Sequence, residues 1–230
     1  AQVVVGKRDL SNISKIVSGV AHTAMLKQDG TVWTWGENTY GQLGKGDFGA
    51  KEVINPVQVV GVNGEGYLTD IVDIAAGQYF TVALKKNGEV VAWGYNNYGQ
   101  LGDCNGNAET PIYVKDIDGN KLTGIIDVSA ARDHSAALKA DGTVWAWGRN
   151  DYGQLGDNTT IASSYAIQVH GVGNSGYLTG IKQISCGGAY VAALSETGEV
   201  YSWGIGKSAQ LGNGAKTTYK YPVKATNVTD

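Results

Sequence analysis

The feature that most constrains the fold is a Trp-Gly pair that occurs four times along the chain. The pairs are Trp35-Gly36, Trp93-Gly94, Trp147-Gly148 and Trp203-Gly204. The intervals between their glycines are 58, 54 and 56 residues, so repeats of this length account for nearly all 230 residues. The repeats lie at approximately 6–62, 63–117, 118–172 and 173–228. Because no linker or change in composition separates them, we expect residues 1–230 to form a single repeat domain.

Each repeat contains the same order of strand and turn signals. Short runs that end in Ala-Leu or Met-Leu occur at His22–Lys27, Phe80–Lys85, His134–Lys139 and Tyr190–Ser195. An Asp-Gly, Asn-Gly or Thr-Gly turn follows each run, and the Trp-Gly segment returns as the partner strand. Each repeat is therefore an antiparallel meander of about four strands, which buries its apolar faces only by stacking on copies of itself. This pattern predicts an all-β chain, a β-propeller of four-stranded antiparallel blades.

Composition and charge exclude several classes of protein. The chain has no run of about 20 apolar residues, so we expect no membrane insertion. A net charge of −3 argues against a nucleic-acid binder that works by bulk charge. The two cysteines, Cys104 and Cys186, are too few for a disulfide framework or a four-ligand zinc site.

The repeated residues resemble a known family. The pattern His-Thr/Ser-x-Ala-Leu, Asp-Gly-x-Val, Trp-Gly-x-Asn-x-Tyr-Gly-Gln-Leu-Gly is similar to the regulator of chromosome condensation repeat, and the match covers essentially the whole chain. The resemblance implies a β-propeller, usually of seven blades, whereas this chain has four repeats. Either four blades close, or the propeller is partial, or several chains assemble.

The two ends of the sequence bear on these alternatives. Val3–Val5 and Pro222–Ala225 both resemble the last strand of a repeat, so one copy of that strand is surplus. A surplus strand or an open arc leaves sheet edges and an apolar blade face exposed, and such surfaces pair with other chains. We therefore expect self-association through exposed blade edges.

Most of the repeated residues have a structural interpretation. The four tryptophans recur in register and are expected to fill the space between blades. His22 and His134 share a repeat position with Phe80 and Tyr190, which favours a half-buried, hydrogen-bonded ring over a ligand or a general base.

The fourth repeat departs from the signature. Gly206, Ser208 and Ala209 replace the Asn, Tyr and Gly of the other repeats. Alanine in place of glycine predicts a different turn there, or a position that does not need positive φ.

Three short patterns could carry chemistry, and each has a simpler explanation. Gly171–Gly176 matches G-x-G-x-x-G but lacks the strand and helix that dinucleotide binding requires. Asp133, His134 and Ser135 are adjacent on a strand and point to alternate faces, so they cannot form a catalytic relay. Asp103–Glu109 is loosely calcium-like and is expected to be a polar turn. The sequence thus predicts no enzyme, no cofactor and no metal site.

Recognition needs residues that differ between repeats. Two variable loops of each repeat, one before the histidine position and one after Trp-Gly, are expected at the end opposite the Asp-Gly hairpins. The middle two repeats concentrate residue types there that are enriched in protein interfaces. The candidate partner-binding residues are Tyr79, Tyr95, Arg132, Asp133, Arg149 and Asp151.

The residues and the resemblance together favour a protein–protein interaction scaffold. Within that class, the resemblance extends to propeller inhibitors of β-lactamases, which favours a secreted or surface protein of a bacterium. The alternative function is a guanine nucleotide exchange factor for a small GTPase. An ultraviolet photoreceptor of the same fold needs a tryptophan cluster before the histidine position. This chain disfavours that activity, because the corresponding residues are Val20, Gln78, Arg132 and Gly188.

Overall fold

The computed structural model describes residues 11–226 and contains four sheets, each of four antiparallel strands. Blade 1 contains β1 (Ile13–Ser18), β2 (His22–Lys27), β3 (Val32–Asn38) and β4 (Gly49–Gln58). Blade 2 contains β5 (Ile71–Ala76), β6 (Phe80–Lys85), β7 (Val90–Gly94) and β8 (Ala108–Tyr113). Blade 3 contains β9 (Ile125–Ala131), β10 (His134–Lys139), β11 (Val144–Gly148) and β12 (Ser163–Gln168). Blade 4 contains β13 (Ile181–Cys186), β14 (Tyr190–Ser195), β15 (Val200–Gly204) and β16 (Tyr219–Lys224).

The strands are consecutive within every blade, and hairpins connect the second and third strands. The predicted turns form there, and Gly30, Gly88, Gly142 and Gly198 have φ values between 79° and 87°. The register places each histidine-position residue opposite the glycine of its Trp-Gly pair, as in His22 with Gly36. The all-β fold of four-stranded antiparallel blades is thereby confirmed.

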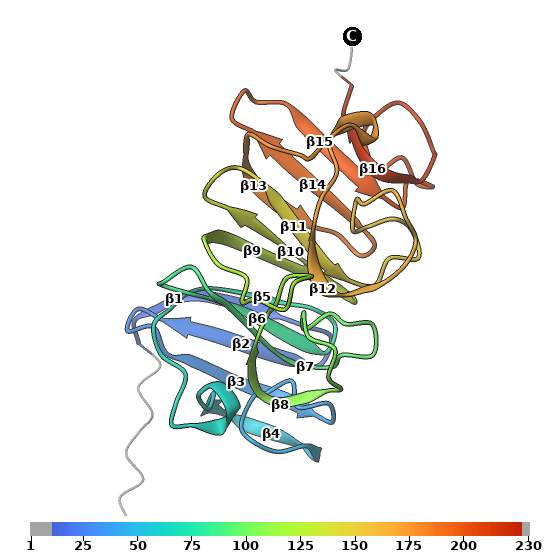
Figure 1. Cartoon of the computed structure of the whole chain (residues 1–230). Coiled ribbons are helices and arrows are strands. Elements are labelled where there is room, and N and C mark those ends of the chain that lie inside the picture. Colours follow the sequence, from blue (N-terminus) through green and yellow to red (C-terminus); the bar gives the residue numbers. More distant parts are fainter. Residues whose placement is uncertain (1–10, 227–230) are drawn as a thin grey trace, which may run out of the picture.

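The blades form an open arc. Blades 1 and 4 lie at opposite ends of the molecule, with blades 2 and 3 between them (Figure 1). The four blades of one chain therefore do not close on themselves. The predicted last strand at Pro222–Ala225 falls largely within β16, and Val3–Val5 lies outside the described residues.

Tryptophan fills each of the three junctions between blades, as the repeat pattern predicts. Trp93, Trp147 and Trp203 are fully buried. Their indole Nε1 atoms donate hydrogen bonds of 3.0, 2.9 and 3.0 Å to the backbone carbonyls of Gln42, Gln100 and Gln154 in the preceding blade. Trp35 has no preceding blade within the described residues and is only half-buried. The repeated tryptophan therefore joins each of these blades to the blade before it.

In the first three blades, an asparagine side chain forms hydrogen bonds that hold the Gly-Gln-Leu-Gly loop in place. The Oδ1 atoms of Asn38, Asn96 and Asn150 accept hydrogen bonds of 2.9–3.1 Å from the backbone N–H of the leucine in that motif. Their Nδ2 atoms donate to the end of the following loop, as from Asn38 to the carbonyl of Asp47. Gly206 removes this clamp from blade 4, where its N–H meets Thr218 Oγ1 at 3.4 Å instead.

Ala209 retains the turn that glycine makes in the other repeats. Its φ of 61° lies in the left-handed region, beside values of 80°, 79° and 74° for Gly41, Gly99 and Gly153. The expectation of a different turn or a relaxed φ is therefore wrong. The Gly-Gln-Leu-Gly loop demands positive φ here even when the residue carries a Cβ, which costs strain.

The two histidines of the repeat position are more deeply buried than expected. His22 and His134 are 3% and 0% exposed, so the expected half-burial is wrong. The Nε2 atom of His22 lies 3.0 Å from Thr81 Oγ1 in the next blade. Within the described residues His134 has no hydrogen bond of good geometry, because Val191 stands where blade 2 has Thr81.

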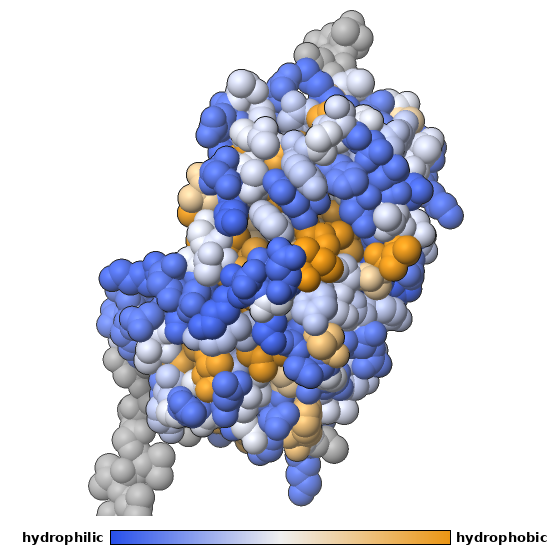
Figure 2. Space-filling view, viewed as in Figure 1, coloured by the Kyte–Doolittle hydropathy of each residue, from blue (hydrophilic) through white to orange (hydrophobic). Residues whose placement is uncertain are grey.

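The surface is mostly hydrophilic in the view of Figure 2, and apolar residues gather there in separate patches. Residues 11–226 include no helix with the length and apolarity that a bilayer-spanning segment requires.

Candidate binding face

The Trp-Gly glycine brings the two variable loops of each blade together. Gly94 has a φ of 109°, and a Cβ on it would lie 2.5 Å from the carbonyl oxygen of Tyr79. This close approach lets the N–H of Tyr95 donate to the Tyr79 carbonyl at 2.9 Å. The N–H of Arg149 donates to the Asp133 carbonyl at the same distance in blade 3. The two loops thus share one end of each blade, where the sequence predicts a common face.

Three tyrosines form a cluster across the junction of blades 1 and 2. The ring centroids of Tyr40 lie 5.2 Å from Tyr79 and 4.9 Å from Tyr95, and Tyr79 lies 6.4 Å from Tyr95. All three rings are half-buried. Burial, with smaller effects from Tyr98 and Asp133, raises the pKa of Tyr95, so its phenol stays neutral and able to donate. The cluster is a preassembled aromatic surface with polar hydroxyl groups.

An ion-pair network lies on blade 3, next to the tyrosines. The guanidinium of Arg149 lies 2.5 Å from Asp151 and 3.2 Å from the buried carboxylate of Asp133. The same guanidinium covers the ring of Tyr98 on blade 2 at 4.7 Å from its centroid. The hydrogen bond to Asp151, followed by that to Asp133, raises the pKa of Arg149. Arg149 is thereby fixed in place on three sides.

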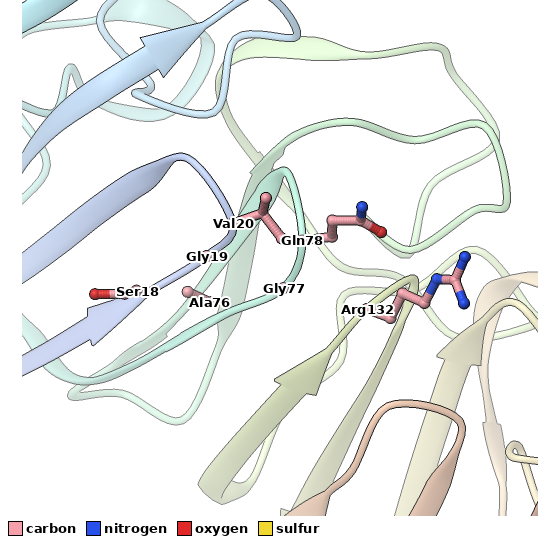
Figure 3. A pocket seen from close by; sticks show the side chains of 7 residues that line it. All are labelled: Ser18, Gly19, Val20, Ala76, Gly77, Gln78 and Arg132. Carbon is pink, nitrogen blue, oxygen red and sulfur yellow. The ribbon is translucent and has the colours of Figure 1, made fainter.

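Arg132 is the most exposed member of the ion-pair network. Its side chain is 61% exposed, and its Nε lies 3.5 Å from Asp133, a carboxylate that it shares with Arg149. It borders a hollow of about 460 Å³ at the inner ends of blades 1 to 3. Figure 3 shows Val20, Gln78 and Arg132 on three neighbouring segments around this hollow. Arg132 has the freedom to pair with a group that approaches from outside.

The structure brings the six predicted residues together in two groups. Tyr79 and Tyr95 belong to the tyrosine cluster, and Arg132, Asp133, Arg149 and Asp151 belong to the ion-pair network. Sequence reasoning missed Tyr40 and Tyr98, because both belong to the repeated signature and were assigned to the scaffold. Each contacts a variable residue of the next blade. Their position directly before Gly-Gln-Leu-Gly is the signal that could have identified them.

The residues Asp133, His134 and Ser135 serve separate structural roles. Asp133 pairs with arginines, His134 is enclosed in the core, and the Ser135 hydroxyl donates to the carbonyl of Gln100 at 3.2 Å. Burial lowers the pKa of His134 to about 4, so the ring is neutral near pH 7. No proton relay connects the three side chains.

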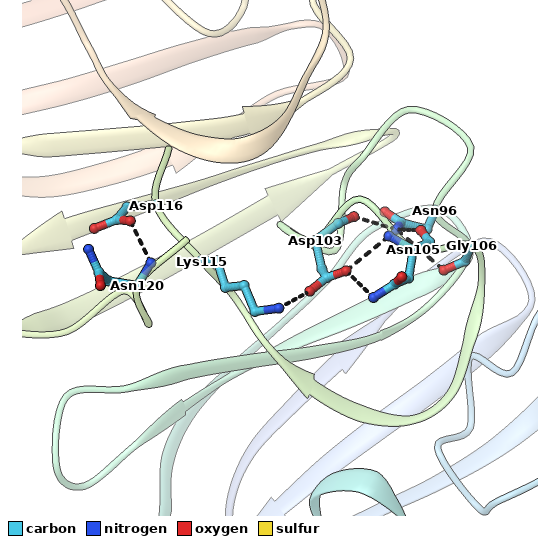
Figure 4. A network of polar contacts seen from close by, with 7 residues as sticks. All are labelled: Asn96, Asp103, Asn105, Gly106, Lys115, Asp116 and Asn120. Atoms are coloured by element: carbon cyan, nitrogen blue, oxygen red, sulfur yellow. Dashed lines mark hydrogen bonds and ion pairs between the residues drawn. The ribbon is translucent and has the colours of Figure 1, made fainter. Parts of the chain in front are cut away.

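The calcium-like segment is a turn closed by a lysine. Asp103 is buried and accepts a hydrogen bond of 2.7 Å from Lys115 Nζ, and Asn105 bonds to the same carboxyl group (Figure 4). Asn96 binds the carbonyls of Asp103 and Asn105 from the other side. The ammonium group of Lys115 lies beside the Asp103 carboxylate, at the position that a bound calcium ion would take.

The G-x-G-x-x-G segment forms a short loop. Val172–Asn174 is a single 3₁₀ turn, and Gly173 within it has a φ of 66°. This turn is too short to offer the helix N-terminus on which a pyrophosphate binds. Val62–Gly64 forms the equivalent turn after blade 1.

Four-stranded blades joined by Trp–Gln contacts, with variable loops gathered on one face, define a repeat protein of the β-propeller class. The family model of the RCC1-like domain matches residues 1–229, and the chain belongs to this family.

Curated relatives are similar over most of this chain. The ultraviolet-B receptor UVR8 of Arabidopsis thaliana is 30% identical over 210 residues, which cover 91% of this chain and 45% of the relative. The probable E3 ubiquitin-protein ligase HERC4 of Rattus norvegicus is 35% identical over 219 residues, covering 94% of this chain and 20% of the relative. The chain thus spans less than half the length of these relatives.

Solved structures share the fold. Human WBSCR16 superposes with a TM-score of 0.77 at 21% identity, covering 96% of this chain and 55% of that one. Yeast RCC1 (Prp20), in a complex with Kap60, gives a TM-score of 0.77 at 23% identity, covering 96% of this chain and 50% of that one.

Proposed function

We propose that this chain is a protein-binding module and that its partner binds across blades 1 to 3 at the loop face. The observation that carries the proposal is the tyrosine cluster of Tyr40, Tyr79 and Tyr95 beside the exposed guanidinium of Arg132. Tyrosine and arginine dominate interface hot spots because they offer large contact areas with polar ends. The cluster is assembled before binding, which lowers the entropy cost of ordering these side chains.

Structurally similar proteins that bind other proteins support a protein partner. Yeast RCC1 (Prp20) was solved with Kap60 bound, and a second study of Prp20p describes its binding to Gsp1p and histones. We assign binding, and no catalytic step, to the present chain. Inhibition of a bound enzyme, as in propeller inhibitors of β-lactamases, and a secreted or surface location in a bacterium stay predictions. Nucleotide exchange on a small GTPase is the alternative outcome of partner binding.

Site-specific photo-cross-linking tests the proposal. A photoreactive amino acid replaces Tyr79 on the loop face, and in a matched variant it replaces Asn87 at a hairpin turn on the opposite face. In an extract of the source organism, we expect one discrete cross-linked protein from position 79 and none from position 87. Adding Arg132→Glu to the position-79 variant is expected to remove the product, because the charge that faces the partner is reversed. Equal products from both positions, or a product that Arg132→Glu leaves unchanged, would contradict the proposal.

The double variant Tyr79→Ala with Arg132→Ala measures what this face contributes. We expect it to weaken binding to the cross-linked partner by at least tenfold, since two hot-spot residues are each worth about 1 kcal/mol or more. Unfolding stays cooperative, because Arg132 is exposed and Tyr79 is half-buried. Isothermal titration calorimetry gives the first quantity and a thermal melt gives the second. If the melt loses cooperativity, these residues belong to the core.

A further inference from the structure

Each internal junction is made by the same set of contacts. The backbone N–H of an isoleucine at the start of the inner strand donates a hydrogen bond of 3.1 Å to the carbonyl of the hairpin glycine in the preceding blade. The three pairs are Ile71 with Gly30, Ile125 with Gly88, and Ile181 with Gly142. The Trp Nε1 to Gln carbonyl bond lies further out along the same junction, and apolar residues fill the space between them.

Blade 1 exposes one half of such a junction, which we call the first-blade face (Ile13, Ile16 and Trp35). Ile13 is 42% exposed, whereas Ile71, Ile125 and Ile181 at the same repeat position are at most 3% exposed. Ile16 is 60% exposed, and its counterparts Ile74, Val128 and Ile184 are at most 6% exposed. The Trp35 indole has no carbonyl acceptor among the described residues. This face therefore has the residues of a junction, and no opposing blade contacts it within residues 11–226.

Blade 4 exposes the complementary half, which we call the fourth-blade face (Val200, the carbonyls of Gly198 and Gln210, and Gly212). Val200 is 42% exposed, whereas Val32, Val90 and Val144 are fully buried. Within residues 11–226 no donor reaches the carbonyls of Gly198 and Gln210. A Cβ on Gly212 would meet only Ala225, whereas at Gly44, Gly102 and Gly156 it would meet the tryptophan of the next blade.

We propose that the first-blade face of one copy binds the fourth-blade face of a second copy, so that two copies close end to end into a ring. Trp35 then donates to the Gln210 carbonyl, and the Ile13 N–H donates to the Gly198 carbonyl. Two copies of four blades give eight, which lies within the range in which propellers close. Because closure covers both faces of both copies, growth stops at two chains.

Ala209 limits the strength of this junction. A Cβ on the corresponding glycines would lie 2.7 Å from Ala108 O for Gly41, 2.4 Å from Ser164 Cα for Gly99 and 2.5 Å from Lys220 Cα for Gly153. Ala209 carries a real Cβ at this position, and Ile54 of the second copy takes the place of these backbone atoms. The outer strands must therefore part slightly, and the proposed association is weaker than an internal junction.

Multi-angle light scattering over a concentration series tests the proposal. The chain of 24.1 kDa is expected to approach twice that mass and to stop there. Ile16→Glu and Val200→Glu place an unpaired charge on the two faces, and each is expected to give the mass of one chain. Ile126→Glu is the matched control, because Ile126 is 56% exposed on an inner strand away from both faces. This control is expected to leave the dimer intact.

Ala209→Gly distinguishes the proposed docking from any other contact, and it removes no packing. It is expected to lower the concentration at which half of the chains are dimeric. A mass of one chain at all concentrations for both the wild type and Ala209→Gly would overturn the proposal. A dimer that survives either glutamate substitution, or a mass that keeps rising beyond two chains, would overturn it as well.

Discussion

Histidine occupies one repeat position twice, and its two rings differ in their surroundings. His22 reaches Thr81 in the next blade, whereas for His134 the position of that threonine is taken by Val191, and the ring has no hydrogen bond of good geometry in the described structure. Burial lowers the pKa of both rings from 6.5 to about 4. The environment of a repeated residue is thus determined by what the neighbouring repeat places against it.

The buried histidines predict a loss of stability in acid. Between pH 6.5 and 4 the unfolded chain binds these protons and the folded chain does not, so the free energy of unfolding falls as pH falls. Each ring accounts for up to about 3 kcal/mol of this loss. His134→Phe, which copies Phe80 of the second repeat, is expected to reduce the difference in unfolding free energy between pH 7 and 4.5. Urea denaturation at pH 7 and at pH 4.5 measures this difference in the free energy of unfolding.

The partly exposed His170 provides the control for this experiment. His170→Asn also removes one histidine, but from a surface loop where the ring contacts Asn174 and Tyr177. If His134→Phe changes the pH dependence no more than His170→Asn does, the burial of His134 is not the cause of the acid sensitivity.

Ala209 gives a second prediction at the scale of one residue. An alanine in the left-handed region is strained, and glycine removes that strain at the cost of some backbone entropy. Ala209→Gly is expected to raise the free energy of unfolding by about 1 kcal/mol. The adjacent Ser208→Gly, at a position without positive φ, is expected to lower it. Both values come from chemical denaturation below the concentration at which chains associate, and the reverse order of stabilities would contradict this account.

At the scale of the element, the blade junction combines a buried indole with a carbonyl acceptor in the preceding blade. Trp147 is enclosed between blades 2 and 3, and its Nε1 donates to the carbonyl of Gln100 at 2.9 Å. Trp35 holds the same place in its own blade but has no such acceptor within the described residues. We therefore expect Trp147 to contribute more to the free energy of unfolding than Trp35 does.

Trp147→Ala is expected to lower the free energy of unfolding by about 3–5 kcal/mol, because it empties a large buried site and removes one of the two hydrogen bonds that the Gln100 carbonyl accepts. Trp35→Ala is expected to cost markedly less in the monomer. Chemical denaturation of both variants supplies the comparison. Equal losses would mean that the tryptophan stabilises its own blade and not the junction.

The elements that were predictable from the sequence are those with local signals. The hairpins follow from turns such as Asn87-Gly88, and the strand His134–Lys139 was predicted with the bounds that the structure gives. The roles of Tyr40 and Tyr98 have no strand or turn signal of this kind, because their contacts cross blade junctions, and only their position directly before Gly-Gln-Leu-Gly marks them. Ala209 was misjudged because the demand for positive φ comes from the whole Gly-Gln-Leu-Gly loop and overrides the preference of one residue.

At the scale of the whole molecule, the arrangement of blades determines both candidate surfaces. The loop face needs at least blades 1 to 3, since its tyrosines and arginines come from three consecutive repeats. Within residues 11–226, the first-blade and fourth-blade faces at the two ends of the arc have no blade against them. The sequence left open whether four repeats close, because each repeat encodes only the contact with its neighbour and not the curvature of the full arc.

Hydrogen–deuterium exchange of the chain with and without its cross-linked partner tests directly whether the loop face binds a protein. We expect slower exchange in segments 77–79, 95–98 and 132–133, with no change at the hairpin turns 28–30, 86–88 and 140–142. Protection at those hairpin turns, with the loop face unchanged, would show that the partner binds the opposite side and would contradict the proposed function.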